Sequence, residues 1–342
     1  MTDIRGLSLG ELEERLTQWG QPRYRAGQLF DWLHKKGADA FAEMKNLPAA
    51  LREQLAGECF IATAAVERKL VSQLDGTVKY LFRLRDGEMV EGVVMRYKHG
   101  LSICLSTQVG CKMGCSFCAS TLAGFVRSLT AGEMLAQIYT ASRDLGERIG
   151  NVVLMGIGEP LDNYEQVLRF IANVTSPKGI DLSPRHITLS TCGLCDQIRR
   201  LADEQLPITL SISLHAPFDE MRDRLMPVNR RYNIAQLLDA CRYYAEKTGR
   251  RVSFEYTLIA GVNDTPACAD RLAQLCRGFL SHVNLIPVNA VEETGYTHGS
   301  EGEIRAFQER LVRQGVNATV RRTLGADISA ACGQLRRQEQ HN

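Results

Sequence analysis

The sequence predicts an α/β fold: a partial (β/α)6-type barrel that follows a small α-helical unit and a short antiparallel β meander. Three observations predict it. From about residue 100 onwards, short apolar runs alternate with amphipathic stretches, as parallel strands and their crossover helices do. Upstream, the pairs Asp75-Gly76 and Asp86-Gly87 separate three strand-like runs. The first sixty residues carry apolar side chains at helical spacing.

The amino-terminal part is predicted to be helical. Ser8 and Glu11 form a capping box, and Pro48 begins a further helical stretch. Three strand-like runs follow, at residues 66–73, 78–84 and 88–96. We therefore divide the chain into a helical accessory domain (1–60), an antiparallel β extension (61–97), a barrel (98–335) and a tail (336–342).

The barrel is predicted from alternating strands and helices. Strands are expected at 102–106, 152–155, 187–190, 208–214, 252–259, 283–286 and 318–321, and helices at 130–143, 164–173, 234–247, 266–276 and 303–313. Such an order implies right-handed crossovers and a parallel sheet. In a sheet of this kind chemistry gathers on the loops after the strands, and that is where the polar clusters of this sequence lie.

Composition limits the class of protein. With 342 residues, 44% of them hydrophobic, the chain can bury a full core. The formal net charge of +2 is compatible with nucleic acid but does not require it. The apolar runs are too short to cross a bilayer, and the amino terminus lacks a basic stretch followed by an apolar one. We therefore expect a cytoplasmic protein without a membrane partner.

Eleven cysteines favour metal or thiol chemistry in a reducing compartment over a disulfide framework. Cys111, Cys115 and Cys118 lie within eight residues, on a loop that follows a predicted strand. Thiolates suit iron–sulfur clusters and zinc, but a closed structural zinc site needs four protein ligands. Three ligands leave one iron of a 4Fe-4S cluster free for S-adenosylmethionine (SAM). The alternatives are chance clustering, or zinc with His99 or His215 as a distant fourth ligand.

Two further loops carry candidate ligands of a small molecule. The loop Gly156-Ile-Gly-Glu-Pro follows a strand, so its amides and Glu159 are suited to an amino group and a ribose. A tight glycine turn without a ligand is the alternative. His215 follows another strand, and a hydrogen-bonded structural histidine is its alternative.

The cysteine loop, with an aromatic residue before its last cysteine, resembles the signature of the radical SAM superfamily. Further motifs occur in an order similar to that of the RlmN/Cfr family of RNA methyltransferases: Gln108-Val-Gly-Cys-Lys-Met-Gly-Cys-Ser-Phe-Cys, Met155-Gly-Ile-Gly-Glu-Pro, Ser211-Ile-Ser-Leu-His-Ala-Pro, Asn284-Leu-Ile-Pro-Val-Asn and Ala330-Ala-Cys-Gly-Gln-Leu. The resemblance implies a cluster on Cys111, Cys115 and Cys118, and two SAM molecules per turnover. It implies SAM contacts at Gly158, Glu159, Ser190, Ser213, Leu214, His215 and Asn289.

The resemblance also implies the reaction: methylation at carbon 2 of an adenosine in the peptidyl-transferase centre of 23S rRNA, and of adenosine in tRNA anticodon loops. Cys332 would carry the methyl group, Cys104 would release the product through a transient disulfide with Cys332, and Glu91 would accept the proton. Buried core cysteines and a solvated strand glutamate are the alternatives. Cfr-type methylation at carbon 8 and a non-catalytic iron–sulfur or zinc RNA-binding protein are the competing functions.

The remaining expectations concern partners and leftover cysteines. We expect an electron donor such as flavodoxin or ferredoxin, and a monomer. Basic groups that flank Cys332 or lie in the helical part would hold RNA phosphates, unless they are merely solvated; they are Arg321, Arg322, Arg336, Arg337, Arg23, Arg25, Lys35 and Lys36. Cys192 and Cys195 stand where the family reads Ser-Thr-Ser-Gly and are interpreted as incidental rather than a redox or zinc pair. Four isolated cysteines are expected in the core: Cys59, Cys241, Cys268 and Cys276.

Overall fold

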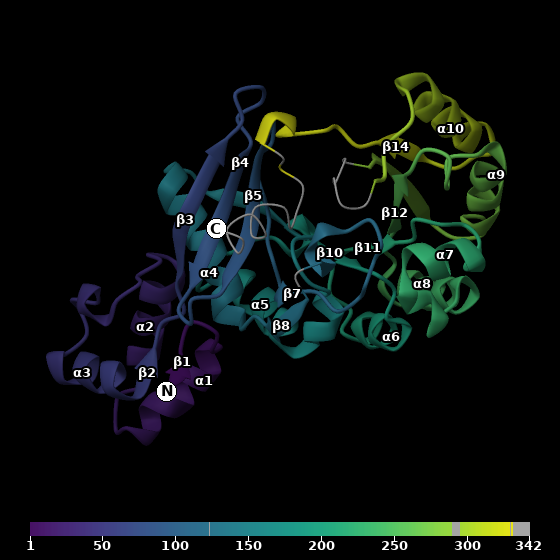
Figure 1. The fold of residues 1–342 in the computed structure, drawn as a ribbon. Coiled ribbons are helices and arrows are strands. Elements are labelled where there is room, and N and C mark those ends of the chain that lie inside the picture. Colours follow the sequence, from purple (N-terminus) through teal and green to yellow (C-terminus); the bar gives the residue numbers. More distant parts are fainter. Residues whose placement is uncertain (123, 289–294, 329, 331–342) are drawn as a thin grey trace.

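The computed structural model describes residues 1–122, 124–288, 295–328 and 330 of the chain (Figure 1). The α-helices are α1 (Leu9–Gln18), α2 (Tyr24–His34), α3 (Ala49–Glu58), α4 (Ala131–Leu145), α5 (Tyr164–Val174), α6 (Cys195–Asp203), α7 (Asp219–Leu225), α8 (Ile234–Thr248), α9 (Pro266–Leu275) and α10 (Glu301–Arg313). Short 3-10 turns are η1 (Phe41–Glu43), η2 (Ala119–Thr121), η3 (Pro160–Asn163), η4 (Pro184–His186), η5 (Pro227–Arg230) and η6 (Ala326–Ile328).

One sheet organises the molecule. The strands are β1 (Thr2–Asp3), β2 (Cys59–Phe60), β3 (Ala64–Val71), β4 (Val78–Leu84), β5 (Met89–Tyr97), β6 (Gly100–Cys104), β7 (Gln108–Gly110), β8 (Phe125–Ser128), β9 (Ile149–Leu154), β10 (Ile187–Thr191), β11 (Thr209–Ser213), β12 (Val252–Leu258), β13 (Ser281–Pro287) and β14 (Ala318–Val320). The main sheet has ten strands in the order β14-β13-β12-β11-β10-β9-β6-β5-β4-β3. β6 pairs in parallel with β9 and antiparallel with β5, so it joins a parallel half to an antiparallel half.

The expected partial barrel is confirmed. Among the described residues β14 and β3 are the two edges of the sheet, so the barrel is curved but open (Figure 1). The meander forms as predicted, and it continues the barrel sheet through the β5–β6 pairing. The expected strands of the parallel half are all present. The sequence analysis did not predict the helices α6 and α7 or the small β7–β8 hairpin.

The two faces of the parallel half differ in polarity. Apolar side chains of each strand pack under the helices, as Phe254 and Tyr256 do, and both are fully buried. The opposite face carries polar side chains, because alternate residues of a strand point to opposite sides. The register aligns Ser213, Glu255 and Asn284 in one row across three strands. The interior of the open barrel is therefore polar enough to receive a charged ligand.

The amino-terminal helices enclose a small core of their own. It contains Leu12, Leu16, Leu29, Phe30 and Leu33. The capping box of Ser8 and Glu11 forms as predicted. This helical unit contacts α4 and α5 of the barrel: Tyr139 bonds to Nδ1 of His34 at 2.8 Å, and Arg169 bonds to Glu11 at 2.5 Å. Among the described residues no helix is both long and apolar enough to span a membrane.

A carboxy-terminal segment, residues 321–328 together with Ala330, leaves β14 and crosses the open side of the barrel to the β3–β4 hairpin (Figure 1). There Asp327 accepts hydrogen bonds from Ser72 Oγ at 2.7 Å and from the Gln73 amide at 2.8 Å. The amide of Gly325 donates to Asp75 at 2.9 Å. The segment thus connects the edge strand β14 with the hairpin of the opposite edge strand β3. Among the described residues these two edge strands do not pair with each other.

Candidate active site

The cysteine loop is enclosed by the β7–β8 hairpin. The loop leaves β7 at Gly110 and returns at Gly124, where the Cys111 amide donates to Gly124 O at 3.2 Å. Gly110 has φ +77°, and a Cβ there would lie 1.7 Å from Gly124 O, so only glycine fits. The far side of the loop is tied to α7, because the Ser116 amide donates to Leu225 O at 3.0 Å. Backbone hydrogen bonds therefore fix the loop at its base, between Cys111 and Gly124, and at its middle, between Ser116 and α7.

A cavity of about 210 Å³ lies inside the barrel against this loop. It brings together most of the site residues expected from the sequence: Cys111, Cys115, Cys118, Gly158, Glu159, Ser190, Ser213 and His215 all line it. Leu214 does not line it; its fully buried side chain belongs to the core under the helices. Asn289 lies outside the described residues. The cysteine loop, the loop after β9 and the carboxyl ends of β10 and β11 thus line one cavity, although the chain between Cys111 and His215 is more than 100 residues long.

The Glu159 carboxylate is held by backbone amides of its own loop and of the loop that follows β10. Its carboxylate accepts from the Leu161 amide at 3.0 Å and from the Cys192 amide at 2.7 Å. Burial raises the pKa of this carboxyl, while these two amides oppose the rise. The side chain is 4% exposed and lines the cavity. An acidic group held in this way is suited to bind an amino group.

His215 is held in one tautomer. Its Nδ1 accepts the backbone N–H of Thr257 at 2.9 Å, which leaves the proton of the neutral ring on Nε2. Burial, followed by the nearby charge of Arg222, lowers the pKa of His215 to about 3. The ring stands edge-on to Phe117, with centroids 4.9 Å apart. His215 is thus a hydrogen-bonded buried histidine and a cavity residue at once, so the two alternatives do not exclude each other.

Arg222 of α7 holds these loops in place. Its guanidinium, 0% exposed, donates to three backbone oxygens and one side chain: Leu214 O (3.1 Å), Ser213 O (3.1 Å), Cys192 O (2.7 Å) and Asn229 Oδ1 (3.0 Å). Planar guanidinium groups present several donors in a fixed geometry. A single buried side chain therefore fixes the ends of β10 and β11 relative to α7. The sequence analysis missed this residue, since a lone arginine in a helix carries no motif.

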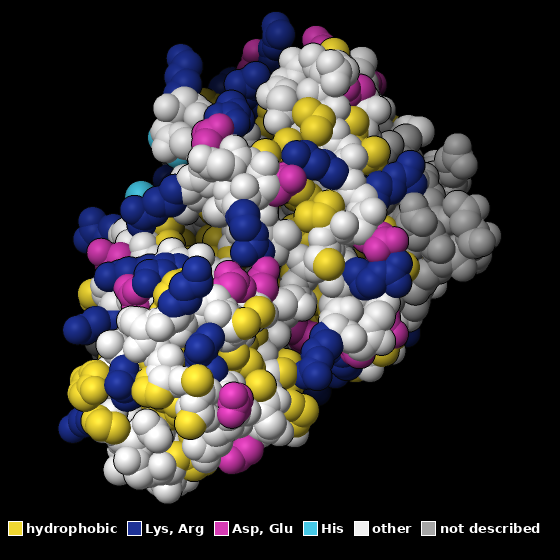
Figure 2. Space-filling model, turned by 90° about the vertical axis from the view of Figure 1, so that its left-hand side faces the viewer, with side chains coloured by type: hydrophobic (Ala, Val, Ile, Leu, Met, Phe, Trp, Pro, Cys, Tyr) yellow, Lys and Arg dark blue, Asp and Glu magenta, His cyan; other side chains and the backbone are white. Residues whose placement is uncertain are grey.

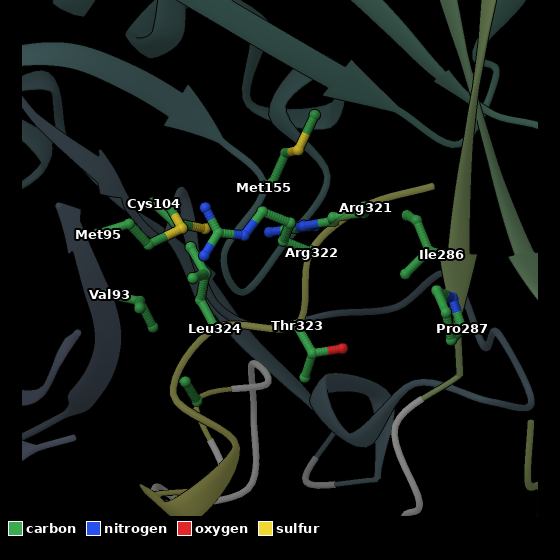
Figure 3. Close-up of a pocket in the computed structure, with 11 residues that line it drawn as sticks. Val93, Met95, Cys104, Met155, Ile286, Pro287, Arg321, Arg322, Thr323 and Leu324 are labelled. Atoms are coloured by element: carbon green, nitrogen blue, oxygen red, sulfur yellow. The ribbon is translucent and has the colours of Figure 1, made fainter. Parts of the chain in front are cut away.

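A second cavity, of about 180 Å³, contains Cys104 (Figure 3). Val93 and Met95 of β5 line it beside Cys104, while Leu324 and Ala330 cover it from the carboxy-terminal segment. Figure 3 shows the side chains of Arg321 and Arg322 extending into its centre. Met155, Ile286 and Arg321 line both cavities, so the two spaces adjoin. Cys332, Arg336 and Arg337 lie outside the described residues, beginning two positions after Ala330.

Glu91 of β5 is buried, with 1% of its surface exposed. Its carboxylate accepts from Lys79 of β4, with 3.2 Å between Oε2 and Nζ. The alternative of a solvated strand glutamate is therefore wrong. The reason is topological: β5 is an interior strand of the sheet, and the carboxy-terminal segment covers the face to which Glu91 belongs.

The comparison with known proteins agrees with this geometry. Residues 2–61 match the model of the ribosomal RNA large subunit methyltransferase N-terminal domain, and residues 105–269 match that of the radical SAM superfamily. A probable dual-specificity RNA methyltransferase RlmN of Alkaliphilus oremlandii (strain OhILAs) is 54% identical over 340 residues, which cover 99% of both chains. One of Clostridium perfringens (strain 13 / Type A) is 51% identical over 98% of this chain and 97% of its own. The chain belongs to the RlmN family of dual-specificity RNA methyltransferases.

A solved structure extends the match to three dimensions. The crystal structure of a radical SAM methyltransferase from Sphaerobacter thermophilus has a TM-score of 0.93 and 46% sequence identity, and the alignment covers 98% of this chain and 99% of that one. The RlmN family and its radical SAM core imply a 4Fe-4S cluster and SAM as cofactors. The expectation of an enzyme, rather than a non-catalytic binding protein, is thereby confirmed.

The residues of this RlmN-family site fit such a cluster. Among the described residues, no three His, Cys, Asp or Glu side chains meet closely enough for a single metal ion. The three cysteines nevertheless face one cavity, and a cubane separates its thiolate ligands more widely than a single ion does. Burial raises the pKa of Cys111 to about 11 and that of Cys115 further, so bound iron would have to displace their protons. The donor set is therefore a thiolate set with one side open to the cavity.

The other cysteines are buried. Cys59, Cys241, Cys268 and Cys276 are 0–6% exposed, as expected of core residues. Cys195 begins α6, and Cys192 lines the first cavity among Cys115 and Phe117. Neither has the partners of a zinc site among the described residues. Cys192 is thus a small buried side chain at the first cavity of this RlmN-family protein.

Sequence reasoning missed Glu255. It lines the first cavity from β12, accepts from Ser211 Oγ at 2.6 Å and from Asn284 Nδ2 at 2.7 Å, and is 5% exposed. The available signal was the strict alternation Ser253-Phe-Glu-Tyr-Thr257, which places its polar residues on one face. The expected pattern for a parallel strand, apolar on both faces, hid that signal.

Proposed function

We propose that this enzyme methylates carbon 2 of an adenosine in the peptidyl-transferase centre of 23S rRNA, and adenosine in tRNA anticodon loops. One observation carries the proposal: the cavity of the three cysteines adjoins the cavity of Cys104 through Met155, Ile286 and Arg321. A radical generated in the first cavity would therefore form directly beside the cavity that contains the Cys104 thiol. The printed names of the relatives, dual-specificity RNA methyltransferases, supply the substrate class.

In this proposal Cys111, Cys115 and Cys118 would hold the cluster. When bound there, the cluster would supply the electron that cleaves SAM to a 5′-deoxyadenosyl radical. Gly158, Glu159, Ser190, Ser213, Leu214, His215 and Asn289 bind the cosubstrate. The described side chains support this: Glu159 offers a carboxylate to the methionyl amine, and the neutral Nε2–H of His215 offers a donor. Leu214 contributes through its backbone, since its side chain points into the core.

The thiols answer a chemical difficulty. Carbon 2 of adenine belongs to an electron-poor amidine, so it does not attack the methyl group of SAM. We assign the methyl group first to the sulfur of Cys332, by nucleophilic displacement from one SAM. Loss of a hydrogen atom from that methyl to the 5′-deoxyadenosyl radical lets its carbon bond to carbon 2, and the unpaired electron of the resulting adduct would pass back to the oxidised cluster. Ala330, two residues before Cys332, packs beside Cys104, which supports a Cys332 sulfur close to this pocket.

Release of the product requires a base and a second thiol. Glu91 accepts the proton lost from carbon 2, and the Cys104 thiolate attacks the sulfur of Cys332. The bond from that sulfur to carbon breaks, and the released carbon takes up a proton to become the methyl group of the product. The two cysteines are left as a disulfide, which two electrons and two protons must reduce before the next turnover. We propose an electron donor such as flavodoxin or ferredoxin for the reductive steps.

We propose that residues 1–60 form an RNA-binding accessory domain, residues 61–97 a β extension, residues 98–335 the barrel and residues 336–342 a tail. The helical unit has its own core, and Arg23 and Arg25 are exposed on it. Figure 2, a view from the side of these helices, shows Lys and Arg side chains spread over the surface with fewer acidic ones among them. Arg321 and Arg322 bring positive charge into the second cavity, beside an extruded base. We further propose a monomer that acts in the cytoplasm, where its RNA substrates are found.

Mass spectrometry of adenosines from RNA treated with the reconstituted enzyme, SAM and a reductant tests the position of methylation. We expect 2-methyladenosine. Formation of 8-methyladenosine would instead assign the Cfr-type reaction, and unmodified RNA together with 5′-deoxyadenosine would show that the radical forms on a different substrate.

Substitution of the two thiols tests the mechanism. Cys332→Ala should carry no methyl group and give no product, while Cys104→Ala should stop with protein and RNA covalently joined. Both variants should keep the iron content and visible spectrum of the parent, since neither residue is a proposed ligand. Product formation at the parental rate by either variant would contradict the two-thiol route.

A further inference from the structure

A buried ion pair lies inside the antiparallel half of the sheet. Nζ of Lys79 and Oε2 of Glu91 are 3.2 Å apart, and the two side chains are 1% and 0% exposed. Lys79 is among the largest fully buried side chains of the described residues. Lysine is almost never buried to this extent in a folded protein. Its position therefore calls for an explanation beyond packing.

The strand register places this pair beside the reacting thiol. Lys79 is opposite Val93, and Val93 is opposite Cys104, so these three residues form one row across β4, β5 and β6. Residues directly opposite each other in an antiparallel pair point to the same face. Glu91 is two residues before Val93 on β5 and shares that face. Val93 and Cys104 line the second cavity, so the ion pair borders the same space.

Stability alone does not account for the pair. Taking two charges out of water costs more than their attraction commonly returns, and apolar residues of the same volume are often as stable or more so. A buried charge without a partner, in contrast, is strongly unfavourable. The ammonium group of Lys79 lies against the Glu91 carboxylate in a part of the sheet from which water is excluded. The pair therefore fixes the position of that carboxylate.

We propose that Lys79 is a positioning residue for the base: its ion pair holds the Glu91 carboxylate in place and directs it along the face that carries Cys104, ready to take the proton from carbon 2. This inference rests on the proposed function, in which Glu91 is that base. Lys79 itself does not touch the reacting atoms. Its contribution is confined to the step that resolves the covalent protein–RNA intermediate, and earlier steps do not depend on it.

The groups that face Glu91 come from three sides. β4 contributes Lys79, and β6 contributes Cys104 in the row of Val93. The short strand β7 contains Gln108, Val109 and Gly110, none of which titrates. The carboxy-terminal segment contributes Arg322, whose side chain enters the shared cavity. Lys79 is the one of these with an ion-pair contact to the Glu91 carboxylate.

A single-turnover experiment tests the assignment. Reconstituted enzyme with the methyl group already on Cys332 is mixed with target RNA, SAM and dithionite, then quenched at intervals. A denaturing gel measures the protein–RNA intermediate, and chromatography measures 5′-deoxyadenosine. For Lys79→Met we expect the intermediate to form at the parental rate and to resolve about 100-fold more slowly, the usual scale for loss of a general base. Lys79→Arg, which keeps a cation at this position, should restore part of the rate.

Glu91→Gln and the double variant separate the two claims. If Glu91→Gln resolves the intermediate at the parental rate, the proposed role of Glu91 fails. If Glu91→Gln is slow but Lys79→Met is not, the role of Lys79 fails while the proposed function stands. In Lys79→Met/Glu91→Gln both charges are absent, so this variant avoids a lone buried charge. Because Lys79 acts through Glu91, the double variant should be no slower than Glu91→Gln; multiplied effects would overturn the proposal.

Lys69→Met is the matched control. Lys69 lies on the neighbouring strand β3 and also forms an ion pair, at 2.6 Å to Asp144, but its side chain is 34% exposed. This variant should resolve the intermediate at the parental rate. A slowdown in Lys69→Met equal to that in Lys79→Met would show that any lost ion pair in this sheet has the same effect, and would overturn the assignment.

Discussion

The two halves of the ten-stranded sheet hold their polar groups in different ways. In the parallel half several of them stand on loops after the strands and are bonded to backbone groups, as Glu159 is to the Cys192 amide, while Glu255 lies within β12 and is bonded to uncharged side chains. In the antiparallel half they stand within the strands, where Glu91 is bonded to another charged side chain. The first half is covered by its own crossover helices, the second by a segment that returns from the far edge of the sheet.

This difference separates two kinds of site. A loop held by backbone hydrogen bonds is formed mostly by residues near it in the sequence, so a motif can encode it. A charged pair inside a sheet needs strands in the right register, and it needs a segment distant in the sequence to cover it. The cover matters because two charges attract each other more strongly when water is excluded. The proposed cluster and SAM site is of the first kind, and the proposed proton-transfer and thiol site is of the second.

The largest effect is expected where a side chain, rather than backbone, supports the parallel half. Arg222→Met leaves three buried carbonyl oxygens without their donor, so we expect the free energy of unfolding to fall by about 4 kcal/mol. SAM binding, measured by equilibrium dialysis, should weaken with it. Arg224→Met, an exposed position on the same helix, should leave the urea unfolding midpoint unchanged. Parental stability in Arg222→Met would mean that the ends of β10 and β11 keep their positions without the hydrogen bonds from Arg222.

Gly110→Ala tests whether the hairpin keeps the cysteine loop in shape. The new Cβ would meet Gly124 O at 1.7 Å in a left-handed backbone conformation, so we expect a loss of about 3 kcal/mol and less iron per protein after reconstitution. Gly124→Ala is the control, because its φ is +69° but no atom lies within 4 Å of its Cβ. It should lose about 1 kcal/mol from backbone strain alone. Equal losses would show that the close approach is not essential.

The third comparison concerns the contact between the helical unit and α4. Burial lowers the pKa of His34 to about 3, while the unfolded chain has its ordinary value near 6.5. The unfolded state therefore binds more protons below pH 6.5, and stability falls as the pH is lowered through that range. Between pH 7 and 5 the loss from His34 should be about 2 kcal/mol. His34→Gln should lose that much less over the same interval in urea unfolding; an identical pH profile would place the titrating groups elsewhere.

Asp327→Ala tests the return of the chain over the antiparallel half. Asp327 anchors the segment to Ser72 and Gln73, so its loss lets the segment move away from Cys104. We expect methylation to fall roughly tenfold through the lower effective concentration of Cys332, with SAM binding unchanged. Glu67→Ala, on β3 where the carboxylate pairs with the half-exposed Arg83, is the control. If SAM binding fell as much as methylation, the proposed SAM site and the proposed thiol site would depend on the same contacts, and the comparison between the two halves would fail.

The smallest effect is expected at the RNA surface. Arg23→Glu/Arg25→Glu should weaken RNA binding about threefold at moderate salt, with a smaller salt dependence than the parent, because fewer phosphate contacts remain. Filter binding at several salt concentrations measures both quantities. Arg313→Glu on α10, at the other end of the molecule (Figure 1), should bind as the parent does. Equal weakening by Arg313→Glu would indicate a general charge effect without a docking surface.

Much of the parallel half was predictable. Alternating apolar runs located β9–β13 because strands and helices have different periods, and the spacing of Cys111, Cys115 and Cys118 indicated the proposed cluster loop. The helices α6 and α7 were missed because they are short and rich in charge, and Arg222 was missed with them. Glu91 was found only through its alignment with a family, and the local pattern around it suggested a solvated residue.

The sequence by itself determined the order of elements, the loop chemistry and the family, because these depend on residues that are near one another along the chain. Only the tertiary structure decided that Lys79 and Glu91 are buried together on the face of Cys104, and that Leu324 and Ala330 of the carboxy-terminal segment pack against this face. The physical reason is that burial and charge pairing depend on which distant segments come into contact. No local pattern of residues encodes that contact.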